Sequence, residues 1–341
     1  MHFRGGGKNS ITEEVTIKIQ SKMNKQVQGK DRDCFPLYSL YCYLKIRLTG
    51  KLNKKDLHEL YRCTLCNQCH YMGFNQSARE RAVKKGLILP HVAEITQNIR
   101  KFGNSYGVDT SREENKQQGD NKWDKVETIL FRGCTSRYKV PEILDAVANL
   151  LRYRGIEYAT MANETCCGGL LFNLGDQTAG LETVRDNIEK FKAAGVKRII
   201  TVCPGCYDAF HVYYKGQYGF DPEIILAIDL LKGLTFTGED FHIQDPCHAR
   251  DKAFNVRTIV PSRRYIEESS CCGAGGGVIA HDKSLACTKA KKKPWIKVPQ
   301  KWSPTVHCAT LTCHLRNQIK CLIFICCWMI SCSPTIMIDG F

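Results

Sequence analysis

The sequence lacks the segments that would direct it out of a reducing compartment and the motifs that would bind a nucleotide. Residues Met1–Lys30 are polar and basic, without the apolar core of a secretory signal. No flavin or nicotinamide fingerprint is present, and the glycine run Gly273–Gly277 is not followed by the Lys-Ser/Thr pair of a phosphate-binding loop. No nucleic-acid-binding motif accompanies the net charge of +15, which is spread along the chain. We therefore expect a cytoplasmic protein whose main ligand is not nucleic acid.

Cysteine, by contrast, is abundant, with 20 cysteines among 341 residues. Thiols stay reduced in the cytoplasm and structural disulfides are rare there, so clustered cysteines predict metal ligation before disulfide bonding. Hydrophobic content of 43% and charged content of 24% are ordinary for a globular protein, and the length suffices for about two or three domains. The composition predicts a globular protein that binds metal through thiolates.

The hydrophobic pattern predicts a helical part followed by alternating strands and helices, an α+β or α/β fold. The predicted strands are 126–131, 156–161, 198–202 and 241–244, and the predicted helices are 141–153 and 179–194. The strands run toward cysteines, and open α/β sheets place ligands at the carboxyl ends of their strands. The predicted domains are a disordered basic N-terminus at 1–30, a helical domain at 31–107, a linker at 108–122, a first cysteine-rich domain at 123–235, a truncated second one at 236–293 and an aberrant tail at 294–341.

The first cysteine group is the CxxCxxC run Cys63, Cys66 and Cys69. Its two-residue gaps let one loop wrap three thiolates around a cubane corner, as in bacterial ferredoxins. The local position of the fourth ferredoxin cysteine is Gly73, so the run is incomplete. Either Cys34, which precedes Phe-Pro, or Cys42 completes the predicted set. A zinc site on the same thiolates is the alternative interpretation.

Two further groups follow the predicted strands. One consists of Cys134, the adjacent pair Cys166 and Cys167 beside two glycines, and the CPxC pair Cys203 and Cys206. The other begins with Cys247 and continues with the pair Cys271 and Cys272 before the glycine run. Adjacent cysteines beside glycine suit a metal cluster that the backbone approaches closely, because glycine has no side chain to obstruct it.

This arrangement resembles the D-type subunit of heterodisulfide reductase and its CCG-domain iron–sulfur relatives, which include iron–sulfur subunits of glycolate oxidase, anaerobic glycerol-3-phosphate dehydrogenase and lactate-utilisation systems. The resemblance covers roughly residues 33–293, and the first CCG motif matches at every cysteine. It implies a ferredoxin-like helical domain, then two CCG repeats that hold [4Fe-4S] clusters of non-cubane type, at which a disulfide is cleaved. The cluster ligands it implies at the reaction site are Cys134, Cys166, Cys167, Cys203, Cys206, Cys247, Cys271 and Cys272.

The expected function is that of an iron–sulfur oxidoreductase. Electrons enter at a cubane cluster on Cys63, Cys66, Cys69 and Cys34 and pass to the CCG clusters, where two electrons reduce a disulfide. The resemblance implies the anionic heterodisulfide of coenzymes M and B as substrate, which suits the basic chain. His248, next to Cys247, either serves the cluster as a hydrogen-bond or proton donor or has a structural role at a helix start.

The alternative function is a non-catalytic electron-relay subunit of a flavoprotein dehydrogenase. In either case we expect a partner subunit of flavoprotein, ferredoxin or cytochrome b type to donate electrons. The chain contains no convincing transmembrane segment of its own, so we expect any contact with the membrane to be peripheral and made through that partner.

The second CCG repeat departs from its pattern near the C-terminus. Where a CPxC pair is expected, the chain has Cys308 and Cys313 with a four-residue gap. When the codons that can encode the chain from Lys293 onward are read in another frame, they permit the sequence AMDKGATKVVTNCPLC. This sequence aligns with FKAAGVKRIITVCPGC, the residues Phe191–Cys206 of the first repeat, at the glycine, the threonine and the CPxC pair. Lys291–Lys293 implies an adenine-rich stretch that is prone to insertion or deletion. We therefore interpret residues 294–341 as an out-of-frame product and not as a membrane anchor.

Overall fold

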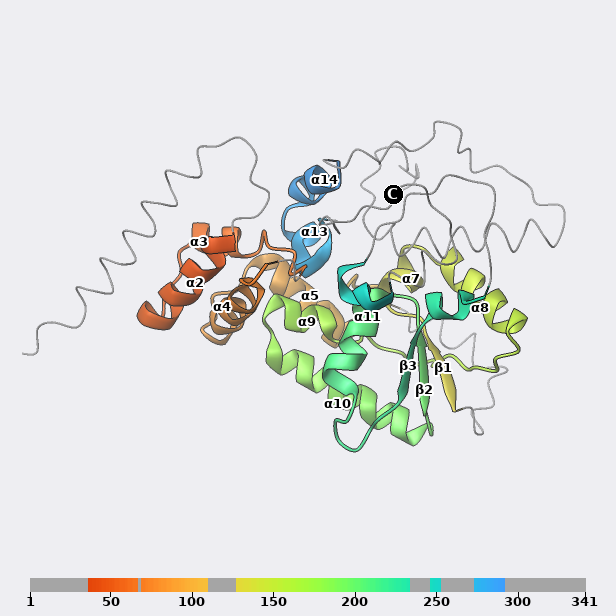
Figure 1. Ribbon diagram of the computed structural model, residues 1–341. Coiled ribbons are helices and arrows are strands. Elements are labelled where there is room, and N and C mark those ends of the chain that lie inside the picture. The colour runs from red at the N-terminus through yellow and green to blue at the C-terminus, as the bar shows by residue number, and fades with distance from the viewer. Residues whose placement is uncertain (1–35, 67–68, 110–126, 234–245, 253–272, 292–341) are drawn as a thin grey trace, which may run out of the picture.

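The computed structural model describes residues 36–66, 69–109, 127–233, 246–252 and 273–291. Figure 1 shows a helical part beside a small sheet flanked by helices. The fold is thus a mixed, helix-rich one with a small parallel sheet. No helix in these ranges is both long and apolar enough to span a membrane. Cys34, the pair Cys271 and Cys272, the predicted strand 241–244 and the tail 294–341 lie outside the described residues.

The helical part contains the helices α2 (Pro36–Thr49), α3 (Lys54–Leu60), α4 (Met72–Lys84) and α5 (Pro90–Phe102). A capping box between Asn53 and Asp56 starts α3. Pro90 opens α5, and Gly103 ends it with a φ of 67°, which glycine adopts without strain. These local signals explain why the prediction of a helical region is confirmed between residues 36 and 102.

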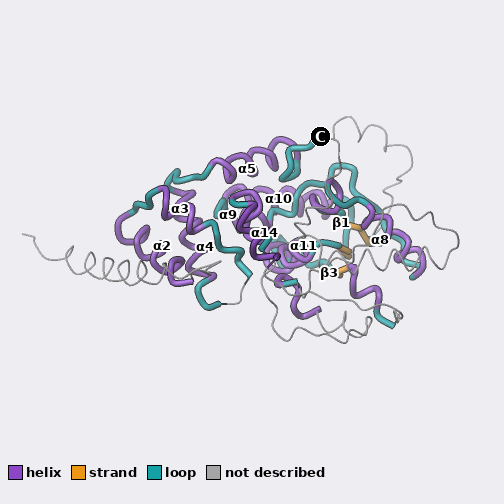
Figure 2. The backbone as a smooth tube through the Cα atoms, turned by 90° about the horizontal axis from the view of Figure 1, so that it is seen from above, coloured by secondary structure: helices purple, strands orange, loops and turns teal. Residues whose placement is uncertain are grey.

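The sheet consists of three parallel strands in the order β1-β2-β3, namely β1 (Thr128–Phe131), β2 (Arg198–Thr201) and β3 (Glu223–Leu226). The predictions at 126–131 and 198–202 are confirmed, whereas no prediction covers β3. Figures 1 and 2 show the sheet between α8 (Glu142–Tyr153) on one side and α9 (Gly169–Leu174), α10 (Gln177–Ala193) and α11 (Pro204–Ala209) on the other. Both strand faces are covered, so the strands are apolar almost throughout.

The prediction of a strand at 156–161 is wrong. This segment makes a single parallel bridge, between Ile129 and Ala159. The chain leaves the sheet immediately afterwards, because the carbonyl oxygen of Met161 accepts a hydrogen bond from the Arg132 guanidinium at 2.6 Å. A polar side chain therefore takes the place of the next ladder bond.

The two parts share packing at α9. Leu171 and Leu174 belong to the apolar core of the helical part, while Phe172 on the same helix belongs to the core around the sheet. Two later helices, α13 (Val278–His281) and α14 (Lys283–Lys291), return to the helical part, where the His281 ring contacts the rings of His58 and His91. Residues far apart in sequence thus meet around α9.

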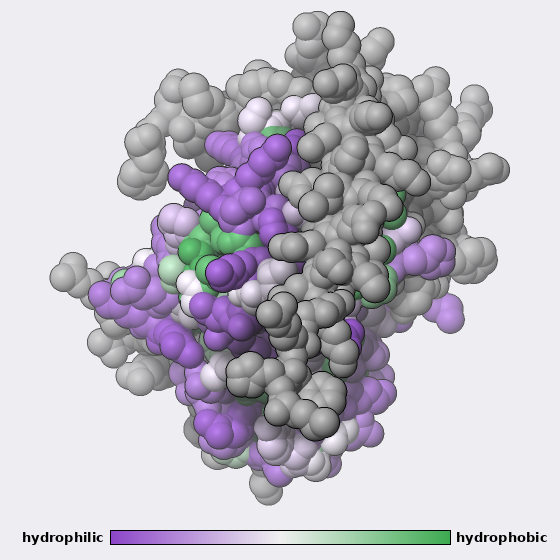
Figure 3. Space-filling view, turned by 90° about the vertical axis from the view of Figure 1, so that its left-hand side faces the viewer, coloured by the Kyte–Doolittle hydropathy of each residue, from purple (hydrophilic) through white to green (hydrophobic). Residues whose placement is uncertain are grey.

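The described surface is largely polar on the face that Figure 3 presents. Among the described residues on that face hydrophilic ones predominate, and the most continuous hydrophobic area lies between them. Most of the buried apolar side chains belong to the two cores that meet at α9, while some large ones, such as those of Tyr153 and Leu181, are exposed.

Candidate metal centre

The five cysteines of the first CCG group converge at the carboxyl edge of the sheet. Cys134 begins the short helix α7 (Cys134–Tyr138) three residues after β1, and Cys203 caps α11 just after β2. Side-chain hydrogen bonds link Cys134 to Cys166, Cys166 to Cys167, Cys167 to Cys206 and Cys206 to Cys203. Because β1 and β2 are parallel neighbours, their ends carry these residues to one edge.

Glycines let the backbone approach these sulfurs. A Cβ added to Gly133, whose φ is +71°, would lie 3.3 Å from the Cys206 Sγ. One added to Gly169 would lie 3.0 Å from the Ala209 Cβ and 3.6 Å from the Cys167 Sγ. Any other residue at these positions would fill space next to the sulfurs.

Four of the five thiols are shielded from water. Cys166, Cys167, Cys203 and Cys206 are at most 8% exposed, whereas Cys134 is half-buried. Hydrogen bonds from the thiols of Cys166 and Cys206 lower the pKa of Cys167 well below its ordinary value. A hydrogen bond from Cys206 likewise lowers the pKa of Cys203. The same contacts raise the pKa of Cys166 and Cys206, with burial adding to the rise. The hydrogen bonds between the thiols thus favour the thiolate, the form that ligates metal, at Cys167 and Cys203.

A buried polar scaffold holds the Cys166–Cys167 backbone in place. The Asn187 amide donates to the carbonyl oxygen of Cys166 at 2.9 Å, and the Tyr214 hydroxyl donates to that of Cys167 at 3.0 Å. The same Asn187 amide nitrogen also donates to the Tyr214 oxygen at 3.0 Å. Sequence reasoning missed both residues, since neither belongs to a cysteine motif.

A second buried group fixes the turn before Cys134. The Glu164 carboxylate accepts hydrogen bonds from the backbone amides of Arg132 and Gly133, each at 2.9 Å, and lies 3.5 Å from the Arg132 Nε. Burial raises the pKa of Glu164, while Arg132 and the two amides oppose that rise. This carboxylate ties the Cys166 segment to the end of β1. The sequence did not predict a role for Glu164, although this residue lies two positions before the cysteine pair.

The donor set fits an iron–sulfur cluster. The five linked thiols exceed the four ligands that a structural zinc ion takes, and cysteine thiolates are the usual ligands of iron–sulfur clusters. Within the described ranges, no three His, Cys, Asp or Glu side chains are arranged to hold a single metal ion. The number and type of these donors therefore suit an iron–sulfur cluster better than a single zinc ion.

Cys247 begins a segment that packs against α11, the helix that carries Cys206. The 3₁₀ segment Cys247–Lys252 contacts α11, and Cys247 is half-buried there. His248 Nδ1 lies 3.0 Å from the Asp208 Oδ2. Hydrogen bonds to Asp208 and Cys247 raise the pKa of His248 to about 10. His248 therefore carries a positive charge, and Asp208, two residues after Cys206, is its unpredicted partner.

The CxxCxxC run lies in the loop between α3 and α4. Cys63 is buried, whereas Cys66 and Cys69 are half-buried. The carbonyl oxygen of Cys63 accepts a hydrogen bond at 2.7 Å from the guanidinium of Arg79, a fully buried residue that sequence reasoning also missed. The loop is therefore anchored at Cys63 and more open to solvent toward Cys69.

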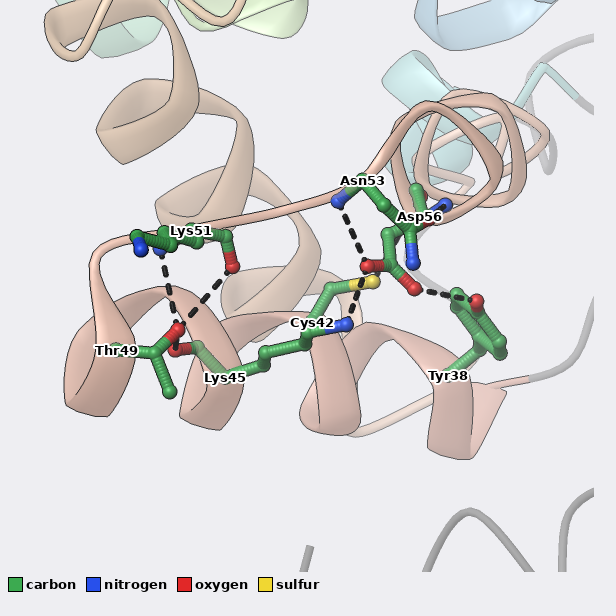
Figure 4. A network of polar contacts seen from close by, with 7 residues as sticks. All are labelled: Tyr38, Cys42, Lys45, Thr49, Lys51, Asn53 and Asp56. Atoms are coloured by element: carbon green, nitrogen blue, oxygen red, sulfur yellow. Dashed lines mark hydrogen bonds and ion pairs between the residues drawn. The ribbon is translucent and has the colours of Figure 1, made fainter. Parts of the chain in front are cut away.

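Cys42, one of the two candidates for the fourth ligand, is fully buried in the helical core. Its thiol donates to the backbone carbonyl oxygen of Asp56 at 3.7 Å. Figure 4 shows Cys42 beside the Asp56 carboxylate, which Tyr38 and Lys45 contact at 2.9 and 2.7 Å. Burial, and then the negative charge of Asp56, raise the pKa of Cys42 far above its ordinary value. The structure thus holds Cys42 as a neutral thiol.

Comparison with known proteins identifies the class to which this centre belongs. Residues 128–211 match the family model of the CCG cysteine-rich domain, a range that contains all five cysteines of the first group. The chain therefore carries a CCG cysteine-rich domain. No solved structure matches the chain.

The curated relatives are iron–sulfur and heterodisulfide reductase proteins. The chain is 27% identical to the D-type subunit of the dihydromethanophenazine:CoB–CoM heterodisulfide reductase of Methanosarcina mazei over 278 residues, which cover 70% of this chain and 67% of the relative. It is 25% identical to an uncharacterised iron–sulfur protein of Methanococcus maripaludis, over 69% of this chain and 52% of the relative. A similar protein of Methanocaldococcus jannaschii is 24% identical, over 76% and 58%. The chain thus spans about half to two thirds of the length of these relatives and is related to that heterodisulfide reductase component.

Proposed function

We propose that this chain is an iron–sulfur oxidoreductase subunit that holds [4Fe-4S] clusters and reduces a small anionic disulfide, such as the heterodisulfide of coenzymes M and B. The observation that carries the proposal is the convergence of five cysteines, linked in a row by side-chain hydrogen bonds, at one edge of a parallel sheet. Relatives that are iron–sulfur proteins support a redox role in general. Bound clusters would supply electrons one at a time to a disulfide that needs two.

We assign the cluster ligands by their surroundings. In the first CCG domain they are the five cysteines of the centre, Cys134, Cys166, Cys167, Cys203 and Cys206. In the second, truncated repeat they include Cys247, followed by Cys271 and Cys272. In the ferredoxin-like helical domain they are Cys63, Cys66 and Cys69, completed by Cys34, because the thiol of the other candidate, Cys42, is fully buried in the helical core and bonded to the Asp56 carbonyl oxygen.

The burial of the cysteines supports a direction of electron flow. Cys66 and Cys69 are half-buried and thus partly accessible to solvent, whereas four of the five thiols of the first CCG group are buried. Electrons from a flavoprotein, ferredoxin or cytochrome b partner would enter at the helical domain. In this proposal the chain works in the cytoplasm and reaches the membrane only through such a partner.

A second candidate function is a relay subunit of a flavoprotein dehydrogenase. The burial of Cys166, Cys167, Cys203 and Cys206 favours it, since a relay site needs no substrate access. Cys134 is only half-buried, so a small disulfide could reach the centre there, as the reductase function requires.

Anaerobically purified protein tests both candidates. Iron and sulfide analysis, with visible absorption that decreases in a Cys167→Ala variant while that of the N-terminal cluster remains, is expected for a cluster protein. Oxidation of a reduced viologen dye that depends on the heterodisulfide is expected for the reductase. Intact clusters without turnover would favour the relay function, and zinc without sulfide would contradict both.

A further inference from the structure

Arg79 connects three segments that lie far apart in sequence. Its side chain is 0% exposed, and its guanidinium donates hydrogen bonds to backbone carbonyl oxygens of all three. Nη2 donates to Leu60 at 3.0 Å and to Cys63 at 2.7 Å. Nη1 donates to Asn173 at 2.9 Å and to Gly276 at 2.7 Å. The CxxCxxC loop, the end of α9 and the glycine run of the second repeat therefore meet at one side chain.

The backbones around Arg79 are in direct contact. A Cβ added to Gly276 would lie 2.7 Å from the Cys63 carbonyl oxygen, and one added to Gly275 would lie 2.4 Å from that of Thr64. A Cβ on Gly175, just after α9, would lie 2.5 Å from the Arg79 carbonyl carbon. The glycines permit the close approach, and Arg79 satisfies carbonyl groups that the approach removes from water.

Only arginine has the geometry for this junction. A guanidinium presents five N–H donors in a rigid planar fork, whereas a lysine ammonium offers three donors from one atom. The guanidinium carbon also lies 4.4 Å from the centroid of the Tyr61 ring, whose hydroxyl donates to the Leu174 carbonyl oxygen at 2.6 Å. The fork is thus held in one orientation by both the ring and the carbonyls.

We infer that Arg79 is a positioning residue that fixes Cys63 for cluster ligation and raises the reduction potential of the cluster held by Cys63, Cys66 and Cys69. The inference rests on the proposed function. Arginine stays protonated at all working pH values, and a buried charge is weakly screened. One-electron reduction adds a negative charge to the cluster next to Cys63. The Arg79 charge stabilises that reduced state, while Arg79 itself exchanges neither electron nor proton.

The test is a potentiometric titration of the anaerobically reconstituted full chain, followed by electron paramagnetic resonance. Arg79→Gln is expected to make reduction of the N-terminal cluster at least about tenfold less favourable, which is about 59 mV for one electron. Arg79→Lys keeps the charge and loses the fork, so it is expected to bind less iron while its potential shifts by less. Arg62→Gln is the matched control, because Arg62 adjoins Cys63 but is one-third exposed and paired with Glu59. Its potential is expected to stay near that of the wild type.

The outcomes separate this inference from the proposed function. Wild-type protein without iron and sulfide would contradict the proposed function. Wild-type protein with clusters, together with an Arg79→Gln variant of unchanged iron content and unchanged potential, would overturn the inference alone. If Arg79→Gln does not fold, Arg79→Lys decides, because an iron content equal to that of the wild type in that variant would show that the fork does not fix Cys63 and would overturn the inference.

Discussion

The side-chain amide of Asn187 donates a hydrogen bond to the carbonyl oxygen of Cys166, across a distance of 2.9 Å. Its oxygen accepts from the Thr165 hydroxyl at 2.7 Å. Asn187 lies in the middle of α10 and is buried, so the position of the cysteine pair depends on a helix that contributes no cysteine to the centre.

Replacing Asn187 with alanine is expected to destabilise the first CCG domain by about 1–3 kcal/mol, because buried hydrogen-bonding groups lose their partner. Iron content should fall with it, since the Cys166 backbone is no longer held. Thermal unfolding and iron analysis measure the two effects. Asn149→Ala is the control, because Asn149 bonds only to the side chain of Arg152 at the surface in the described structure. Equal stability of the two variants would contradict the assigned role.

The two candidates for the fourth ligand of the N-terminal cluster make opposite predictions. Cys42→Ala is expected to retain the visible absorption of that cluster, because the Cys42 thiol is fully buried in the helical core and bonded to the Asp56 carbonyl oxygen. Cys34→Ala and Cys66→Ala are expected to lose it. Spectra and iron content of the three variants decide the matter, and loss of the cluster in Cys42→Ala alone would show that Cys42 is a ligand.

Contact between the glycine run and the CxxCxxC loop can be tested with two glycines of similar backbone conformation. Gly276 has a φ of +60°, and a Cβ added to it would collide with the Cys63 carbonyl oxygen. Gly216 has a φ of +76°, and a Cβ added to it would have no other atom within 4 Å. Alanine costs about 1–2 kcal/mol at either position through left-handed strain. Gly276→Ala is expected to cost about 1–3 kcal/mol more through overpacking. Chemical denaturation of both variants gives the difference, which should be near zero if the contact is absent.

Stability is expected to fall on acidification because of His91. Burial, with the positive charges of His281, Arg79 and His58, lowers the pKa of His91 from 6.5 to about 4. Between about pH 6.5 and pH 4 the unfolded chain binds a proton at His91 that the folded chain does not bind. The contribution of His91 to the free energy of unfolding is therefore complete above about pH 6.5 and is lost as the pH falls toward 4.

Unfolding temperatures at pH 7 and pH 5 measure this effect, at about 2–4 °C for each kcal/mol. The decrease should be smaller in His91→Gln, which cannot be protonated, and unchanged in His211→Gln, whose histidine is exposed. The same decrease in wild type and His91→Gln would rule His91 out as its source.

The out-of-frame interpretation of residues 294–341 predicts a specific result at the gene. Resequencing through the codons of Lys291–Lys293 is expected to reveal an insertion or deletion that restores a CPxC pair. The mass of the protein purified from its source provides a second measurement. An unbroken frame and a mass matching the printed sequence would exclude the interpretation.

Local sequence patterns anticipated much of the fold and of the centre. Capping residues and apolar periodicity determine α3, α5 and α8, because these signals act within one or two turns of helix. The spacing of Cys134 and Cys203 after their strands predicted a shared edge, since parallel strands end on the same side of a sheet.

Other features depended on contacts that no local pattern encodes. The segment 156–161 has the composition of a strand, yet it makes a single bridge to the sheet, and the Met161 carbonyl oxygen that follows accepts a hydrogen bond from the Arg132 guanidinium. The sequence does not distinguish the thiol of Cys42 from that of Cys66, but packing against Asp56 makes Cys42 a neutral thiol in the helical core.

The sequence by itself determined which residues are thiol donors and in what order they follow the strands. The tertiary structure alone decided which side chains hold those donors in place. Arg79, Glu164 and Asn187 belong to no motif, and each satisfies backbone groups of a distant segment. The physical reason is that buried carbonyl and amide groups need partners, and which partner reaches them is fixed only when the segments pack together.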